Sequence, residues 1–248
     1  MEKNLTKTKS LLAIGIAFIM LISFTFFLTA CGGEPTPSNI VEVSSYNELV
    51  EAINGDKETI KLKNDIDIEN QLNINRKLTL DLNGNKIYNS EAIWTWSSTN
   101  SSGATSMISV FENGDLTIEG NGKMVALKDD VYCVSVWDNG KLNIKDGEFV
   151  GNMHTVYVNK GVADIYGGKF SLDQKSQYDD SRYLLNLLDA NGKNGTAVIN
   201  VYGGTFVDFN PSDNLAENPK VDFVADGYVS VLVEGSTTNY KVIQNNQE

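Results

Sequence analysis

Histidine and cysteine are scarce in this chain, and their scarcity narrows the chemistry available to it. The 248 residues include one histidine, His154, and two cysteines, Cys31 and Cys133. A lone histidine cannot join other histidines in a metal cluster, and no local motif ties it to a serine or cysteine nucleophile. We therefore predict no histidine-based metal site and no catalytic triad, and we interpret His154 as a structural residue at a turn.

Basic residues are also few relative to acidic ones. The chain has 20 lysines and arginines against 32 aspartates and glutamates, which gives a formal net charge of −12. An acidic chain of this kind is a poor match for nucleic acid or for anionic glycans, because both repel it at long range. We predict no nucleic-acid partner.

The first 30 residues have the composition of a targeting segment. Lys3, Lys7 and Lys9 form a basic start, and residues 11–28 are a charge-free apolar run. This pattern indicates a signal peptide over residues 1–30. An uncleaved membrane anchor remains an alternative, because the apolar run is just long enough to span a bilayer.

Small residues precede Cys31 in the sequence Leu-Thr-Ala-Cys, which resembles the lipobox of bacterial lipoproteins. The resemblance implies that Cys31 becomes the lipidated first residue and holds the protein on the cell membrane, facing the extracellular or periplasmic side. Cys133 would then have no disulfide partner, and we expect it to be a small buried residue. Residues 31–43 would be a tether, and the mature chain would keep 17 basic and 31 acidic residues.

An internal repeat organises the remainder of the chain. Residues 108–118 read ISVFENGDLTI and residues 134–144 read VSVWDNGKLNI, and the two align without a gap. Apolar residues alternate in both copies around an Asn-Gly corner, which is typical of a stacked β architecture. Further copies predict inward-facing pairs at Ile60/Leu62, Leu80/Leu82, Leu116/Ile118, Leu142/Ile144, Ala163/Ile165 and Ile199/Val201.

The two ends of the repeat region carry different signals. Residues 44–54 predict a short amphipathic helix with a serine cap, which would cover the first open edge of the sheets. Residues 227–243 predict a β-hairpin that closes the last edge. The expected fold class is all-β, a single-stranded right-handed parallel β-helix of about six coils within residues 44–243.

The sequence resembles a known superfamily in three places. ELVEAI, TIKLKNDIDI and KLTLDLNGNKI within residues 46–88 are similar to the first coils of pectin-lyase-like right-handed parallel β-helices. The later GGKF and GGTF corners and the VADGY segment resemble β-helix surface lipoproteins of bacteria. This superfamily includes lyases, hydrolases, adhesins and proteins without known activity, so the resemblance implies the fold and leaves the activity open.

The outward residues of the repeated strand give little sign of catalysis. They fall into two columns: Lys61, Asp81, Thr117, Asn143, Asp164, Asn200 in one, and Lys63, Asn83, Glu119, Lys145, Tyr166, Tyr202 in the other. In this alignment Asp81 and Asp164 lie three coils apart, about 14 Å, too far for the paired carboxylates of glycoside hydrolysis. We therefore predict no catalytic residues on this face, no cofactor, and no metal site.

Aromatic residues give the candidate ligand contacts. Trp94 and Trp96 lie two apart in a serine- and threonine-rich insertion over residues 89–106, where an extended chain would place both indoles on one face. Tyr166 and Tyr202 stack in the second outward column. Aromatic faces beside hydroxyl and amide groups suit sugar rings. The alternative for the tryptophans is packing against the coil.

Together these patterns predict a lipid-anchored extracellular β-helix that binds or adheres without catalysis, with a glycan or another cell-surface molecule as ligand. Two alternatives stay open. One is a polysaccharide-degrading lyase or hydrolase on the same fold, and the other is a purely structural surface-display protein.

Overall fold

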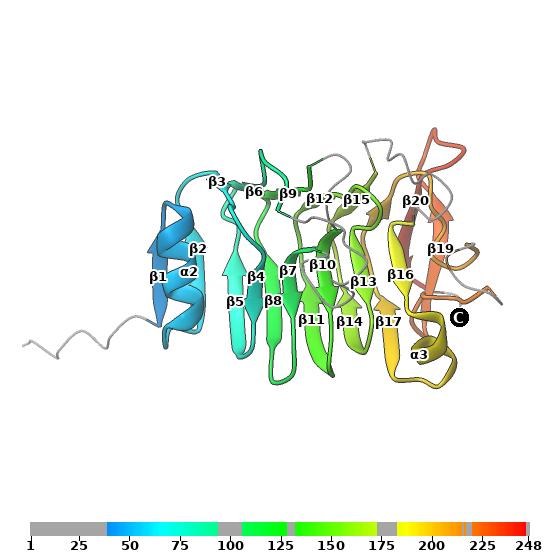
Figure 1. Cartoon of the computed structure of the whole chain (residues 1–248). Coiled ribbons are helices and arrows are strands. Elements are labelled where there is room, and N and C mark those ends of the chain that lie inside the picture. Colours follow the sequence, from blue (N-terminus) through cyan, green and yellow to red (C-terminus); the bar gives the residue numbers. More distant parts are fainter. Residues whose placement is uncertain are drawn as a thin grey trace, which may run out of the picture. The chain divides into compact units, whose positions relative to one another are not determined.

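The structure of the protein is a computed structural model that describes residues 39–93, 106–127, 132–172, 183–214, 216 and 220–246. These residues all belong to the unit Asn39–Glu248. Within it the described strands form three sheets, which we name A, B and C (Figure 1).

Each strand of sheet A lies in parallel beside its counterpart from the neighbouring coil. In order across the sheet, the described strands are β1 Ile40–Val43, β2 Thr59–Leu62, β5 Lys77–Asp81, β8 Asp115–Glu119, β11 Gly140–Ile144, β14 Gly161–Ile165 and β17 Ala197–Val201.

Sheets B and C are built in the same way from the next strands of each coil. Sheet B contains β3 Ile66–Asp67, β6 Lys86–Tyr88, β9 Lys123–Val125, β12 Glu148–Val150, β15 Lys169–Ser171 and β18 Thr205–Phe206, followed by β20 Tyr240–Gln244 and β19 Tyr228–Leu232. Sheet C contains β4 Leu72–Ile74, β7 Ser106–Val110, β10 Tyr132–Val136, β13 Val156–Val158 and β16 Leu185–Leu187.

The chain passes from one sheet to the next and returns to sheet A one strand further along, as a right-handed parallel β-helix does. This confirms the predicted fold class. In the described ranges the sheets hold seven, eight and five strands, so the figure of about six coils stays a prediction.

The core is a set of stacked columns of buried side chains. Phe149, Phe170 and Phe206 form one of them, with ring centroids 5.1 and 5.0 Å apart and rings within 9° of parallel. All three side chains are fully buried. Each ring contact adds about 0.5–1.5 kcal/mol beyond the burial of apolar area.

The repeated sequence is confirmed as two stacked copies of one unit. Ile108 pairs with Val134 between β7 and β10, and Leu116 pairs with Leu142 between β8 and β11. At the corner the asparagines Asn113 and Asn139 adopt the left-handed backbone conformation, with φ of 66° and 70°. Gly140, which follows Asn139, is required for lack of space rather than for its φ angle. A Cβ at this position would lie 2.6 Å from the Val110 carbonyl oxygen.

One part of the predicted register is wrong. We expected Leu80 to stack with Leu116, but Leu80 pairs with Ile118 and Leu78 pairs with Leu116. The cause is that Leu78, Leu80 and Leu82 all point inward, so a shift by two residues preserves the alternation. The consequence is that Asp81 lies opposite Glu119 rather than beside Thr117.

Helix α2 Tyr46–Asn54 confirms the predicted capping helix. The Ser45 hydroxyl accepts a hydrogen bond from the Glu48 amide, and the Glu48 carboxylate accepts one from the Ser44 amide, which is a capping box. At the other end the Arg76 guanidinium donates to the carbonyl oxygens of Ala52 and Ile53 at 2.9 and 2.8 Å. Arg76 therefore ties the last turn of the helix to the segment between β4 and β5.

The observed secondary structure differs in two further places from that predicted from the sequence. Strand β1 begins at Ile40, within the segment 31–43 that we expected to be a tether, and it pairs with β2. A short helix, α3 Asp189–Lys193, lies between β16 and β17 and was not predicted from the sequence. The hairpin is confirmed, since β19 and β20 pair antiparallel and β20 continues sheet B from β18.

Across the described ranges, no helix has both the length and the apolar content required to cross a bilayer.

Candidate functional site

The outer face of sheet A carries a row of charged and aromatic side chains. Lys61, Asp81 and Glu119 lie opposite one another on β2, β5 and β8. The residues that continue the row, Lys145, Tyr166 and Tyr202, each follow the last residue of β11, β14 and β17. The sheet thus brings together side chains that are up to 141 positions apart in the sequence, from Lys61 to Tyr202.

Three tyrosines and a lysine form what we call the tyrosine face: Lys145, Tyr166, Tyr202 and Tyr228. The rings of Tyr166 and Tyr202 stack with centroids 4.8 Å apart and 9° between planes, and Tyr228 meets Tyr202 edge-on at 5.4 Å. The Lys145 ammonium lies 3.2 Å from the centroid of Tyr166. Tyr166 is 41% exposed, which is unusual for so large a side chain and leaves the stack open to solvent.

Polar groups adjoin this face. Asp164 lies on β14 in register with Asn143 and Asn200, and the Asn200 amide donates to its carboxylate at 2.8 Å. Partial burial, followed by the negative charge of Asp164, raises the pKa of both Tyr166 and Tyr202. The two phenols are therefore neutral hydrogen-bonding groups at physiological pH. The stack predicted from the sequence is present, and it has amide and carboxylate neighbours.

Asp81 and Glu119 form a carboxylate pair that the predicted register had separated. Facing residues on adjacent strands are about 4.8 Å apart, which is the separation scale of a retaining glycosidase. The Asp81 carboxylate, however, already accepts the Asn83 amide at 2.8 Å and lies 3.7 Å from the Lys61 ammonium. The Asp81 carboxylate at the end of β5 is therefore already engaged by partners from this chain.

The outer face of sheet C carries a second aromatic cluster, which sequence reasoning missed. We call it the aromatic face, made of Tyr132, Trp137, His154, Tyr157 and Tyr183. Ring centroids are separated by 4.7 Å for Tyr132 and His154, 5.5 Å for Tyr132 and Tyr157, 6.1 Å for Trp137 and Tyr157, and 6.4 Å for His154 and Tyr183. Trp137, which belongs to the second copy of the repeat, is part of this cluster.

Three buried serines lie beside the aromatic face. The hydroxyl groups of Ser106, Ser109 and Ser135 are mutually hydrogen-bonded at 2.6–2.9 Å. The Trp137 indole nitrogen donates to the Ser135 hydroxyl at 2.7 Å. The serines thus fix the position of the tryptophan just after the end of β10.

His154 is held neutral within the aromatic face. The carbonyl oxygen of Tyr183 can only accept, so the Nδ1 atom of His154, 2.9 Å away, carries the ring proton. Nε2 then accepts from the Asn186 amide at 3.1 Å. Burial lowers the pKa of His154 to about 4. The histidine is therefore the structural residue that we predicted, and it is uncharged.

Cys133 is fully buried on β10, as predicted. Its thiol lies 3.3 Å from the Val150 carbonyl oxygen, and burial raises its pKa to about 12. A thiol of this kind stays protonated and does not act as a nucleophile.

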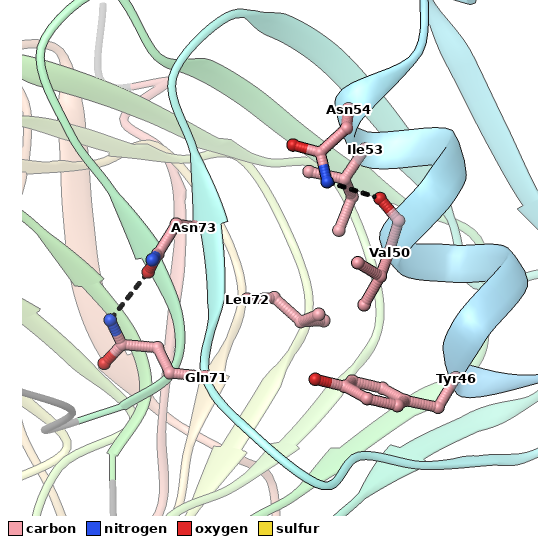
Figure 2. Close-up of a pocket in the computed structure, with 7 residues that line it drawn as sticks. All are labelled: Tyr46, Val50, Ile53, Asn54, Gln71, Leu72 and Asn73. Atoms are coloured by element: carbon pink, nitrogen blue, oxygen red, sulfur yellow. Dashed lines mark hydrogen bonds between the residues drawn. The ribbon is translucent and has the colours of Figure 1, made fainter.

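A small pocket lies between helix α2 and strand β4 (Figure 2). Its volume is about 180 Å³, and its lining residues are Tyr46, Val50, Ile53, Asn54, Gln71, Leu72 and Asn73. The Asn54 amide donates to the Val50 carbonyl, and the Gln71 amide donates to Asn73, so much of the polar lining is already paired. The pocket is smaller than the roughly 300–1,000 Å³ of most ligand sites, and Tyr46 is the one ionisable side chain among its lining residues.

Three predicted site residues, Cys31, Trp94 and Trp96, lie outside the described residues. Within the described part of the chain, no group of three or more histidine, cysteine, aspartate or glutamate side chains is arranged to hold a metal ion.

Comparison with known families agrees with the fold. Residues 40–146 match the family model described as putative pectate lyase-like adhesive domain. The chain thus has the pectate lyase-like parallel β-helix fold that its sequence suggested, and the family model indicates adhesion or binding at a coarse level. Searches of curated proteins and of solved structures found no match.

Proposed function

We propose that this protein is a non-catalytic adhesin that is anchored by lipid on Cys31, faces the outside of the cell and binds carbohydrate through the tyrosine face. The observation that carries the proposal is the open stack of Tyr166 and Tyr202 on sheet A. The exposed parts of these rings and their hydroxyl groups offer apolar and polar contacts to a sugar, and the neighbouring Asp164 and Asn200 offer partners for hydroxyl groups.

Glycan-array binding of the double variant Tyr166→Ala/Tyr202→Ala tests the proposal. Loss of two ring faces should weaken carbohydrate binding at least about tenfold. Tyr88→Ala is the matched control, because Tyr88 lies on β6 of sheet B with the Lys86 ammonium 3.9 Å from its ring centroid. Equal binding by the double variant and the wild type would overturn the assignment of the tyrosine face.

The lipid anchor is tested separately by Cys31→Ala. The variant should leave the membrane fraction or accumulate unprocessed, because it lacks the sulfur that would carry the lipid. Membrane fractionation followed by immunoblotting gives the answer. Unchanged anchoring would favour the alternative of a membrane-spanning segment in residues 11–28.

A hydrolytic function is the second candidate, and the observation in its favour is that Asp81 lies opposite Glu119. It predicts that polysaccharide incubated with wild-type protein is shortened and that Asp81→Asn abolishes the effect. We favour binding, since the Asp81 carboxylate is occupied by the Asn83 amide and the Lys61 ammonium.

A further inference from the structure

The outer face of sheet C presents a row of polar side chains without charge. The row crosses all the described strands of this sheet, one residue from each: Asn73, Ser109, Ser135, Tyr157 and Asn186. The corresponding row of sheet A contains lysine, aspartate and glutamate. Within this row Asn73 is exposed, Tyr157 and Asn186 are partly exposed, and Ser109 and Ser135 are buried.

The rings of the aromatic face surround the centre of this row. Tyr157 is in register between Ser135 and Asn186, and its ring contacts the rings of Tyr132, His154 and Trp137. Tyr132, Trp137, Tyr157 and Tyr183 are each partly exposed. They therefore offer aromatic surface to solvent on a sheet whose backbone is held by hydrogen bonds on both sides.

Hydrogen-bonding capacity remains unused at one end of the row. Asn186 donates its amide to Nε2 of His154, while its side-chain oxygen, Oδ1, is buried and has no hydrogen-bond partner. A buried acceptor without a donor costs about 1–3 kcal/mol, so a ligand that supplies a hydroxyl donor gains from it. Sugar hydroxyl groups are donors of this kind.

His154 and Tyr132 of the aromatic face are neutral at physiological pH. Burial lowers the pKa of His154 to about 4 and raises that of Tyr132 to about 12. None of the five ring residues or the five row residues is a lysine or arginine. The carboxylate of a uronate or sialate would lose hydration here without gaining an ion partner. A neutral saccharide has no charged group and does not pay this desolvation cost.

We propose that the aromatic face of sheet C is a second carbohydrate site of this protein and that it is selective for neutral saccharides. This inference rests on the proposed carbohydrate-binding function and adds a location and a ligand class to it. Tyr157 supplies the central stacking surface, and Asn186 Oδ1 accepts a ligand hydroxyl group.

The test measures binding of the full chain to immobilised neutral gluco-, manno- and galacto-oligosaccharides and, in parallel, to oligogalacturonate. Tyr157→Ala should raise the Kd for neutral oligosaccharides about tenfold, and Asn186→Ala should raise it severalfold. Asn73→Ala is the matched control, since it removes the same residue type from the far end of the same row, and it should leave the Kd unchanged. Tyr157→Phe keeps the ring and should bind as the wild type does, which separates the contribution of the ring from that of the hydroxyl group.

The variants of the two faces distinguish the possible results. Weaker neutral-saccharide binding in Tyr157→Ala, in addition to the separate loss in Tyr166→Ala/Tyr202→Ala, supports a second site beside the first. If Tyr157→Ala and Asn186→Ala bind as the wild type does while Tyr166→Ala/Tyr202→Ala does not, the second site is overturned and the proposed function stands. If the wild type binds none of the saccharides, both proposals fail. Preferential binding of oligogalacturonate through Tyr157 would overturn the predicted selectivity.

Discussion

The outer faces of sheets A and C are built on the same backbone pattern but differ in charge. On sheet A, the row Lys61, Asp81 and Glu119 leads to a lysine-capped tyrosine stack that is open to solvent. On sheet C, serines and tyrosines replace the charges, and Ser109 and Ser135 are almost completely buried. Inward positions must be apolar on every sheet because they fill one core. Outward positions have no such restriction, so each face can acquire its own chemistry.

The difference in burial makes the two faces unequally tolerant of charge. Ser135→Lys should destabilise the fold by about 3 kcal/mol or more, because an ammonium group replaces a buried hydroxyl in a hydrogen-bonded triad. Thr117→Lys, at an outward and partly exposed position of sheet A, should cost below about 1 kcal/mol. Chemical denaturation of both variants measures the contrast. Equal losses of stability would show that the two faces do not differ in this respect.

The buried histidine of the aromatic face predicts a pH dependence of the stability of the fold. The folded-state pKa of His154, about 4, lies below the ordinary value of 6.5. In this interval the unfolded chain binds the proton and the folded chain does not, so stability falls as pH decreases from about 6.5 to about 4. The loss at pH 4 should be at most about 3 kcal/mol.

Thermal unfolding between pH 7 and pH 4 checks this expectation against His154→Gln, which lacks the titrating ring. The variant should be less stable at pH 7, where it loses the contacts with Tyr183 and Asn186, and its stability should vary less with pH. A variant curve that runs parallel to the wild-type curve would assign the pH dependence to other groups.

The smallest effect is expected for an exposed charge cluster on sheet B. Glu148 on β12 lies 2.7 Å from the Lys123 ammonium and 3.6 Å from that of Lys169. The Lys123 hydrogen bond lowers the pKa of Glu148, so its contribution is present above the ordinary value of 4.5 and is lost as pH falls through the lowered folded-state value. Glu148→Gln should cost below about 1 kcal/mol in low salt, and less in high salt because ions screen exposed pairs. A larger loss of stability that does not depend on salt would show that the Glu148 ion pairs are not weak, solvent-screened contacts.

Much of the scaffold could be predicted because its signals are local. The Ser-Ser-Tyr-Asn-Glu segment specifies its capping box through the chemistry of neighbouring residues, and the capped helix forms where expected. The Asn-Gly corners and the alternation around them predict the stacking of residues 108–118 on residues 134–144. The stacked tyrosines were also predictable, because Tyr166 and Tyr202 occupy equivalent positions after aligned inward pairs.

The register of β5 and the whole aromatic face could not be predicted in the same way. Three consecutive inward leucines allow two registers, and only packing against Leu116 and Ile118 selects one. The residues of the aromatic face come from β10, β13 and the segments beside them, and no shared spacing links Tyr132, Trp137 and Tyr183. Their proximity depends on the position of each coil relative to the next.

The alternation in ISVFENGDLTI and VSVWDNGKLNI thus determines by itself that this chain stacks parallel strands and which side chains enter the core, because burial has the same period as the strand. Only the tertiary structure decides which outward residues become neighbours. Strands about 4.8 Å apart bring together side chains from distant coils, and a shift by one repeat of the alternation changes every such contact without any change in the core. The carboxylate pair of Asp81 and Glu119 and the neutral face around Tyr157 are both results of that choice.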